Sequence, residues 1–124
     1  LVNQAIVAIT IGAVSEGLLL AKAGGADPAK VREAIMTGFC QSRILELHGE
    51  RIVQGNFEPG GTVKNQLKDL RTVLDVAKQL NLQLPLTEKV CGLFTDLAAR
   101  GGEGYDHSAL YLQLEALNQM STTP

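Results

Sequence analysis

LVNQAIVAITIGAVSEGLLLAKA, residues 1–23, is the stretch that decides the fold of this chain. Within residues 5–14 the only polar side chain is that of Thr10. A helix that is apolar on nearly every side needs neighbours all round, so we predict that this stretch is the central, buried helix of a bundle. Asn3 and Gln4 place two side-chain amides at its N-terminal end, which makes that end a candidate site.

Small residues recur along the same predicted helix. Ala13, Gly17 and Ala21 are spaced four apart, and residues at this spacing share one helical face. A second helix could therefore approach closely along this stripe.

The first helix is not expected to cross a membrane. Ser15 and Glu16 interrupt its apolar run before the roughly 20 residues that a span requires. A basic leader and a cleavage site, which mark a signal peptide, are both missing from the sequence. The helix begins at residue 1 without a capping residue, and we therefore expect the chain to be part of a longer protein.

The composition is that of one ordinary domain of 124 residues. Hydrophobic residues make up 45% and aromatic residues only 4%, which predicts a core of Leu, Ile, Val and Ala. The net charge of −2 gives no sign of the basic surface that nucleic-acid binding requires. Cys40 and Cys91 stand alone, which is typical of reduced thiols in the cytoplasm. With His48 and His107 as the only histidines, no zinc site can be assembled.

Capping signals divide the remaining sequence into five further helices. The predicted spans are 28–37 after Asp27, 42–54 from Ser42, 63–80 after Thr62, a fifth helix from Thr87 to Arg100, and a last helix capped by Asp106 or Ser108. The tail from Met120 is expected to fray. The sequence contains neither a strand pattern nor a dinucleotide-binding fingerprint, so we predict an all-α, six-helix bundle without a complete catalytic apparatus. We interpret His48, on the apolar face of the third helix, as a packed side chain.

The fourth predicted helix carries a positive stripe. Lys64, Lys68 and Arg71 lie at i, i+4 and i+7, where like charges oppose one another by a few tenths of a kcal/mol. Spacing alone favours a solvated face on which Arg71 pairs with Asp75. The alternative is an anion site for a phosphate or a carboxylate.

Several short motifs occur in a fixed order along the chain. They are LVNQAIVAITIGAVSEGLLLA at 1–21, Gly38 with Ser42, NFEPG at 56–60, LKDL at 67–70, LPLT at 84–87 and DHSAL at 106–110. In this order they resemble the C-terminal helical domain of the β-hydroxyacid dehydrogenases, the group of 3-hydroxyisobutyrate dehydrogenase and tartronate semialdehyde reductase. The resemblance covers essentially the whole chain and implies a helical domain like that of 6-phosphogluconate dehydrogenase.

The resemblance implies that residues 1–124 form the substrate and dimerisation domain of an enzyme whose Rossmann domain, absent from this chain, binds NAD or NADP. The family motif of a lysine, two residues and an asparagine places the catalytic lysine immediately before Leu1. The implied reaction is hydride transfer between the nicotinamide and a small hydroxy acid or semialdehyde, with the lysine exchanging the hydroxyl proton. The isolated chain is expected to be inactive, and the protein to be a cytoplasmic homodimer or higher homo-oligomer.

Three residues of this sequence take up family roles by resemblance. Asn3, with Gln4, would orient the lysine and the substrate through amide hydrogen bonds. Lys68, in the Lys-Asp pair with Asp69, would reach toward the cofactor from the helical domain.

Two departures from the family pattern concern the expected substrate pocket. Gly61 replaces an aromatic residue, and the segment 64–66, Lys-Asn-Gln, replaces an acidic stretch with a histidine. They suggest a substrate other than hydroxyisobutyrate, such as the sugar acid threonate. The alternative function is a non-catalytic helical interaction module, which explains the first helix but gives no reason for Asn3 and Gln4 at its end.

Overall fold

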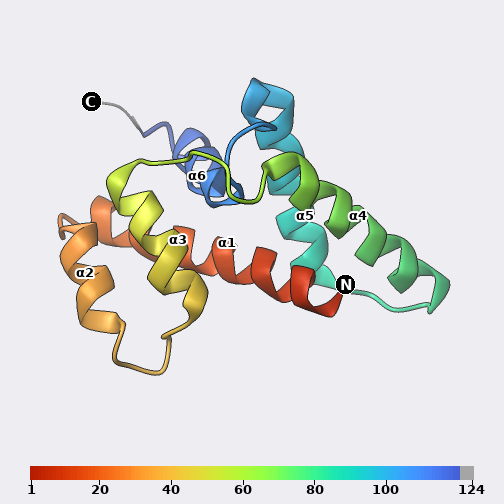
Figure 1. Ribbon diagram of the computed structural model, residues 1–124, viewed down its shortest axis with the longest axis horizontal. Helices are drawn as coiled ribbons and strands as arrows, with labels where there is room; N and C mark the ends of the chain where they lie inside the picture. The colour runs from red at the N-terminus through yellow and green to blue at the C-terminus, as the bar shows by residue number, and fades with distance from the viewer. Residues whose placement is uncertain (121–124) are drawn as a thin grey trace.

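The computed structural model describes residues 1–120, and within them it contains six α-helices (Figure 1). They are α1 (Val2–Ala23), α2 (Pro28–Ile35), α3 (Arg43–Gln54), α4 (Val63–Gln79), α5 (Pro85–Leu97) and α6 (Leu110–Leu117). A π-helical turn, η1 (Ala98–Gly102), follows α5, and a 3-10 turn, η2 (His107–Ala109), precedes α6. The predicted all-α fold of six helices is confirmed. The tail is expected to fray from Met120, and its residues 121–124 lie outside the described residues.

Three of the six α-helices begin at the predicted capping side chains. Asp27, Ser42 and Thr62 each accept a hydrogen bond from a backbone N–H of the first turn that follows. The predicted start of α5 is wrong by three residues, because the helix begins at Pro85 rather than after Thr87. Proline suits the first helical position, where no backbone N–H is needed, and the Thr87 side chain is buried instead of capping.

The core lies where one face of α1 meets the other helices. Figure 1 shows α1 running along the bundle, and it contacts each of α2 to α6. Ala8 and Ile11 are fully buried, and between α1 and α5 a Cβ at Gly12 would lie 3.5 Å from Val90 Cγ2. Gly12 is therefore the glycine of α1 at which a neighbouring helix of this chain comes close.

The opposite face of α1 differs from the prediction of a helix covered all round. Val2, Ile6 and Leu20 are 76%, 60% and 75% exposed, and a Cβ added at Gly17 would meet nothing within 4 Å. The helix is apolar on both sides, but this chain covers only one of them. We call the exposed side, formed by Val2, Ile6, Ala13, Gly17 and Leu20, the α1 stripe.

By length and hydropathy alone, α1 could also cross a membrane. Its most apolar window has a mean hydropathy of 1.7, so the interruption at Ser15 and Glu16 does not exclude a span by composition. The buried core helix of a bundle passes the same test, and in this fold Ser15 itself lies in the interior.

Candidate functional site

The N-terminal end of α1 is joined to α4 by side-chain amides. Gln4 Nε2 donates a hydrogen bond to Asp69 Oδ2 at 2.8 Å, and Asn3 Nδ2 donates to Gln4 Oε1 at 3.0 Å. Gln66 Nε2 donates to the Gln4 backbone carbonyl at 3.2 Å. Asn3 is exposed, whereas Gln4 and Asp69 are half-buried. The structure thus brings two predicted site residues together with the aspartate of the Lys-Asp pair.

The cations of α4 lie on its solvent side. Lys64, Lys68 and Arg71 are all exposed, and among residues 1–120 the expected ion pair of Arg71 with Asp75 does not form. In the same part of the chain, no hydrogen bond or ion pair connects the Lys68 side chain with Asn3 or Gln4. A row of exposed cations suits an anionic ligand such as the phosphates of a dinucleotide.

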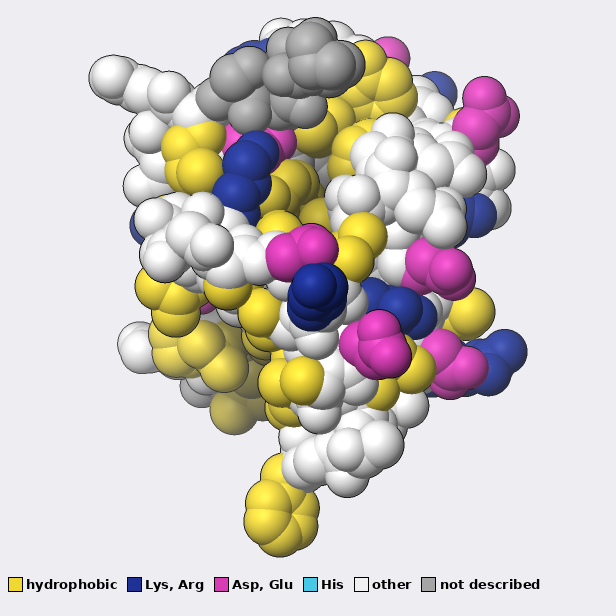
Figure 2. Space-filling model, turned by 90° about the vertical axis from the view of Figure 1, so that its left-hand side faces the viewer, with side chains coloured by type: hydrophobic (Ala, Val, Ile, Leu, Met, Phe, Trp, Pro, Cys, Tyr) yellow, Lys and Arg dark blue, Asp and Glu magenta, His cyan; other side chains and the backbone are white. Residues whose placement is uncertain are grey.

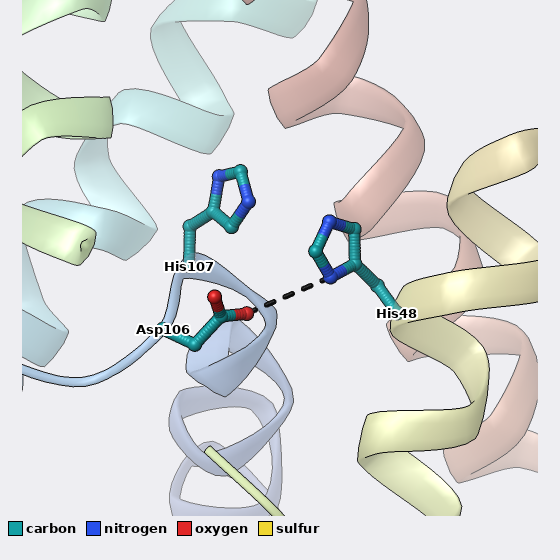
Figure 3. Close-up of side chains that lie close together, drawn as sticks. All are labelled: His48, Asp106 and His107. Atoms are coloured by element: carbon teal, nitrogen blue, oxygen red, sulfur yellow. Dashed lines mark ion pairs between the residues drawn. The ribbon is translucent and has the colours of Figure 1, made fainter. Parts of the chain in front are cut away.

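A second polar centre surrounds Asp106, in the turn before α6 (Figure 3). Its side chain is fully buried. Oδ1 accepts hydrogen bonds from the backbone N–H groups of Gly60 at 2.9 Å and Gly61 at 3.2 Å. Oδ2 accepts from the backbone N–H of Ser108 at 3.0 Å and from the Ser108 hydroxyl at 2.5 Å. This one carboxylate therefore ties the 55–62 loop to the start of α6.

Two histidines and an arginine complete the surroundings of Asp106. His48 Nδ1 lies 3.6 Å from Asp106 Oδ2, and Arg51 Nη1 lies 3.8 Å from Oδ1. The His48 and His107 rings pack edge to face with centroids 4.7 Å apart. His107 Nδ1 is 2.8 Å from Gln66 Oε1, and since the Gln66 nitrogen is already donating to α1, the histidine must be the donor here.

The charges of this centre follow from burial and hydrogen bonding. Burial lowers the pKa of both His48 and His107 below the ordinary 6.5, although attraction to the Asp106 carboxylate opposes the shift. For Asp106 burial acts to raise the pKa, but the hydrogen bonds from Ser108 and Gly60 outweigh it and hold the pKa below 3.8. At neutral pH the cluster is thus one buried carboxylate beside two neutral imidazoles.

His48, Asp106 and His107 also lie within reach of a single metal ion, with ligand atoms within 4.8 Å of one another. The carboxylate oxygens are, however, occupied by four protein donors, and His107 Nδ1 is engaged with Gln66. Among the residues that the structure describes, His48 Nδ1 is buried without a hydrogen-bond partner, but the Asp106 carboxylate makes its hydrogen bonds within the protein, as buried polar groups that hold a fold do. We therefore assign this cluster to holding the fold, with His48 packed as its sequence position suggests.

A hollow of about 930 Å³ lies toward the other end of α1, and none of the predicted site residues lines it. Figure 2 shows this side of the molecule, where hydrophobic side chains form much of the visible floor. Its polar lining includes Lys22 and Glu115, whose Nζ and Oε2 atoms are 2.8 Å apart. Burial, together with the nearby Glu115 carboxylate, raises the pKa of Tyr111 to about 12. The amide end of α1 is an open surface rather than this hollow.

Comparison with known proteins places the chain among dehydrogenases. Residues 1–114 match a family model described as NAD-binding of NADP-dependent 3-hydroxyisobutyrate dehydrogenase. The chain is 51% identical over 115 residues to 2-hydroxy-3-oxopropionate reductase of Escherichia coli K12, which covers 93% of this chain and 39% of that protein. It is 37% identical over 121 residues to the probable 3-hydroxyisobutyrate dehydrogenase-like 1, mitochondrial, of Arabidopsis thaliana, covering 98% of this chain and 36% of that protein.

The fold agrees with a solved structure of the same group. Superposition on 3-hydroxyisobutyrate dehydrogenase from Salmonella typhimurium gives a TM-score of 0.86 at 27% identity, over 90% of this chain and 39% of that chain. The chain spans less than two fifths of the length of these relatives. The resemblance drawn from the motifs is confirmed, and the chain belongs to the NAD-binding 3-hydroxyisobutyrate dehydrogenase family of β-hydroxyacid dehydrogenases.

Proposed function

We propose that this chain is the helical substrate and dimerisation domain of an NAD(P)-dependent β-hydroxyacid dehydrogenase whose Rossmann domain precedes it. The full-length enzyme would transfer hydride between a nicotinamide and a small hydroxy acid or its semialdehyde. The observation that supports this proposal most is the pair of hydrogen bonds from Asn3 to Gln4 and from Gln4 to Asp69 at the exposed end of α1, in a member of this family. Cys40 and Cys91 are free thiols, in keeping with the cytoplasmic location that we propose.

The proposed chemistry places a catalytic lysine immediately before Leu1. A residue there lies three positions before Asn3 and four before Gln4, on the same helical face. The lysine exchanges the proton of the substrate hydroxyl as general acid or base, and the Asn3 amide orients both. The bound dinucleotide supplies or accepts the hydride. The exposed Lys68 ammonium is available to an anionic group of that dinucleotide.

The first substrate to test is 2-hydroxy-3-oxopropionate, the compound in the name of the relative that is 51% identical. The two family departures leave room for another small acid. Gly61 faces the His107 ring, since a Cβ at Gly61 would lie 3.4 Å from His107 Nε2. An aromatic side chain at this position would therefore have to displace the His107 ring.

The test uses the full-length protein with NADH and NADPH against 2-hydroxy-3-oxopropionate, and with NAD and NADP against 3-hydroxyisobutyrate and L-threonate. We expect turnover with at least one pair. The 124-residue chain assayed alone is the control and should show none. Absence of turnover by the full-length protein with every pair would overturn the proposal, and so would turnover by the isolated chain.

We also propose that two copies pair through the α1 stripe. Its five residues run along one face of the helix, and the largest three are more than half exposed. Closed two-fold pairing is the most common oligomer, and the small Ala13 and Gly17 would let two α1 helices approach closely. A stable interface of this kind buries on the order of 2,000 Å² or more, so dissociation should accompany unfolding.

Light scattering coupled to size exclusion, at low micromolar concentration, tests the pairing. We expect a dimer for this chain, and a monomer for Gly17→Glu. The matched control is Gly92→Glu on α5, since both glycines are exposed within helices and a Cβ at either meets nothing within 4 Å. A wild-type monomer of 13.2 kDa, or equal behaviour of the two variants, would contradict pairing through α1.

A further inference from the structure

We infer that Asp69 is a positioning residue for the proposed reaction, acting on Asn3 through the side chain of Gln4. The inference rests on the function proposed above, because it concerns what Asn3 presents to the lysine and the substrate. Its basis is a row of two hydrogen bonds, in which Gln4 Nε2 donates to Asp69 Oδ2 at 2.8 Å and Asn3 Nδ2 donates to Gln4 Oε1 at 3.0 Å.

The two hydrogen bonds of this row can run in only one direction, with the donors pointing toward Asp69. An ionised carboxylate accepts hydrogen bonds and donates none, so the Gln4 side chain must turn its NH₂ toward Asp69. The Gln4 oxygen then faces Asn3, which must turn its own NH₂ toward it. Asn3 Oδ1, the acceptor, is left for other partners. The carboxylate on α4 thus decides which end of an amide on α1 is available.

The backbone of Gln4 is also held by a residue of α4. Gln66 Nε2 donates to the Gln4 carbonyl at 3.2 Å, and Gln66 itself is buried. Residues 66 and 69 lie three apart, on one face of α4. One therefore fixes the backbone of Gln4 while the other fixes its side-chain orientation, so the first turn of α1 has little freedom to rotate.

The polarity has a consequence for the chemistry. A lysine ammonium offers three donors and no acceptor, and the hydroxyl of a hydroxy acid is a donor to any acceptor beside it. An exposed amide oxygen at Asn3 can accept a hydrogen bond from either of them, whereas an NH₂ group can accept from neither the ammonium nor the hydroxyl. Without Asp69, the amides of Gln4 and Asn3 could flip, and a fraction of the molecules would present the wrong end.

The test compares variants of the full-length enzyme. Asp69→Ala should lower kcat about 3- to 10-fold, the effect of one net hydrogen bond, with the KM for the cofactor unchanged. Asp69→Asn retains an oxygen that accepts from Gln4, so it should recover most of kcat. Gln4→Met breaks the row at its middle and should repeat the loss seen for Asp69→Ala.

Coupling with Asn3 separates positioning from general structural damage. In an Asn3→Ala background, Asp69→Ala should lower kcat no further, because the group that it positions is gone. A readout apart from turnover is the ¹⁵N-resolved NMR spectrum, in which the side-chain amide signals of Asn3 and Gln4 should move in Asp69→Ala. Asp75→Ala, which removes an exposed carboxylate on the same helix, is the matched control and should change neither.

The outcomes distinguish this inference from the function on which it rests. A wild type without dehydrogenase turnover would overturn both. An active wild type would overturn the inference alone if kcat is unchanged in Asp69→Ala and Gln4→Met. Additive losses with Asn3→Ala, or a change confined to the KM for the cofactor, would do the same. Thermal unfolding of each variant verifies that it is folded, and Gln4→Met serves if Asp69→Ala is not.

Discussion

Two polar centres lie on α4 and its neighbours, and they differ in how much of their hydrogen bonding is used. Around Asp106 the carboxylate is fully buried and both of its oxygens are occupied by protein donors. At the end of α1 the row from Asp69 through Gln4 terminates in an exposed Asn3. The first centre is closed, and the second leaves an acceptor available to a ligand.

The contrast teaches how to tell a structural polar group from a functional one in this fold. Burial of a charge is costly unless hydrogen bonds compensate for it, so a closed centre such as that of Asp106 has its value in stability. An open centre contributes less to stability, since Asn3 is exposed and Gln4 and Asp69 are only half-buried, and its value lies in what it can bind. Substitutions in the two centres should therefore alter different measured quantities.

The largest expected effect is on stability, from Asp106→Ala. It leaves the N–H groups of Gly60, Gly61 and Ser108 without their acceptor; the buried Ser108 donor alone costs about 1–3 kcal/mol, and the two part-buried glycine bonds add to this loss. We expect the free energy of unfolding of this chain, measured in urea, to fall by about 3 kcal/mol or more. Asp96→Ala removes an exposed carboxylate on α5 and should change it by less than about 0.5 kcal/mol. Equal effects would mean that the Asp106 centre does not hold the fold.

The second effect is on turnover, from Asn3→Ala in the full-length enzyme. Loss of a hydrogen bond to a charged group is worth about 1.5–3 kcal/mol, so we expect kcat to fall roughly 10- to 100-fold. The urea midpoint should stay within error, because Asn3 is exposed. An unaffected rate would remove Asn3 from the proposed site and leave the open end of α1 without a function.

A smaller effect is expected for the cofactor, from Lys68→Ala. One charge-assisted contact to an anionic group predicts a rise of roughly tenfold in the KM for NAD(P)H. Lys78→Ala, an exposed lysine of the last turn of α4, is the matched control. If both variants have the wild-type constants, Lys68 belongs to an ordinary solvated face.

Local sequence signals predicted the elements of this fold well, because each acts within a few residues. The capping residues Asp27, Ser42 and Thr62 each bond the turn that follows, and the spacing of apolar residues marks the buried faces of α3 and α4. The start of α5 was misplaced because Thr87 looks like a cap, whereas Pro85 needs no cap.

The long-range contacts could not be read in the same way. Asp106 was predicted only as a helix cap, yet it also binds Gly60, 46 positions away. Nothing local in the sequence marks that pairing, since a two-glycine turn has many uses. The same holds for Gln4 and Asp69, 65 positions apart. The sequence analysis names Gln4 and Asp69 separately, and only the folded structure brings the two side chains into contact.

The apolar character of α1 was read correctly and its burial was not. Hydropathy predicts that a surface avoids water, but it does not identify what covers the surface. One side of α1 is covered by the helices of this chain, and the α1 stripe is left exposed. The pattern alone does not tell a covered side of the helix from an exposed one.

The smallest expected effect is the pH dependence of stability, and it arises from the closed centre alone. His48 and His107 have folded-state pKa values below 6.5, through burial and despite the Asp106 carboxylate, with Arg51 also acting to lower them. Well above pH 6.5 neither state binds their protons, and the histidines do not reduce stability. As the pH falls below 6.5 the unfolded chain binds protons first, so the free energy of unfolding decreases.

Asp106 adds a second step in the same direction at lower pH. Its folded-state pKa lies below 3.8, so below that pH the unfolded chain again binds the proton first and stability decreases further. Urea unfolding of this chain between pH 8 and pH 3 measures both steps. The double variant His48→Gln with His107→Gln should lose the step below pH 6.5, because these are the only two histidines of the chain. It should keep the step below pH 3.8, because Asp106 is unaltered. Stability that rises between pH 7 and pH 5 would mean that the imidazoles gain more from Asp106 than they lose by burial, and the closed centre would then be an ion-pair site rather than a neutral one.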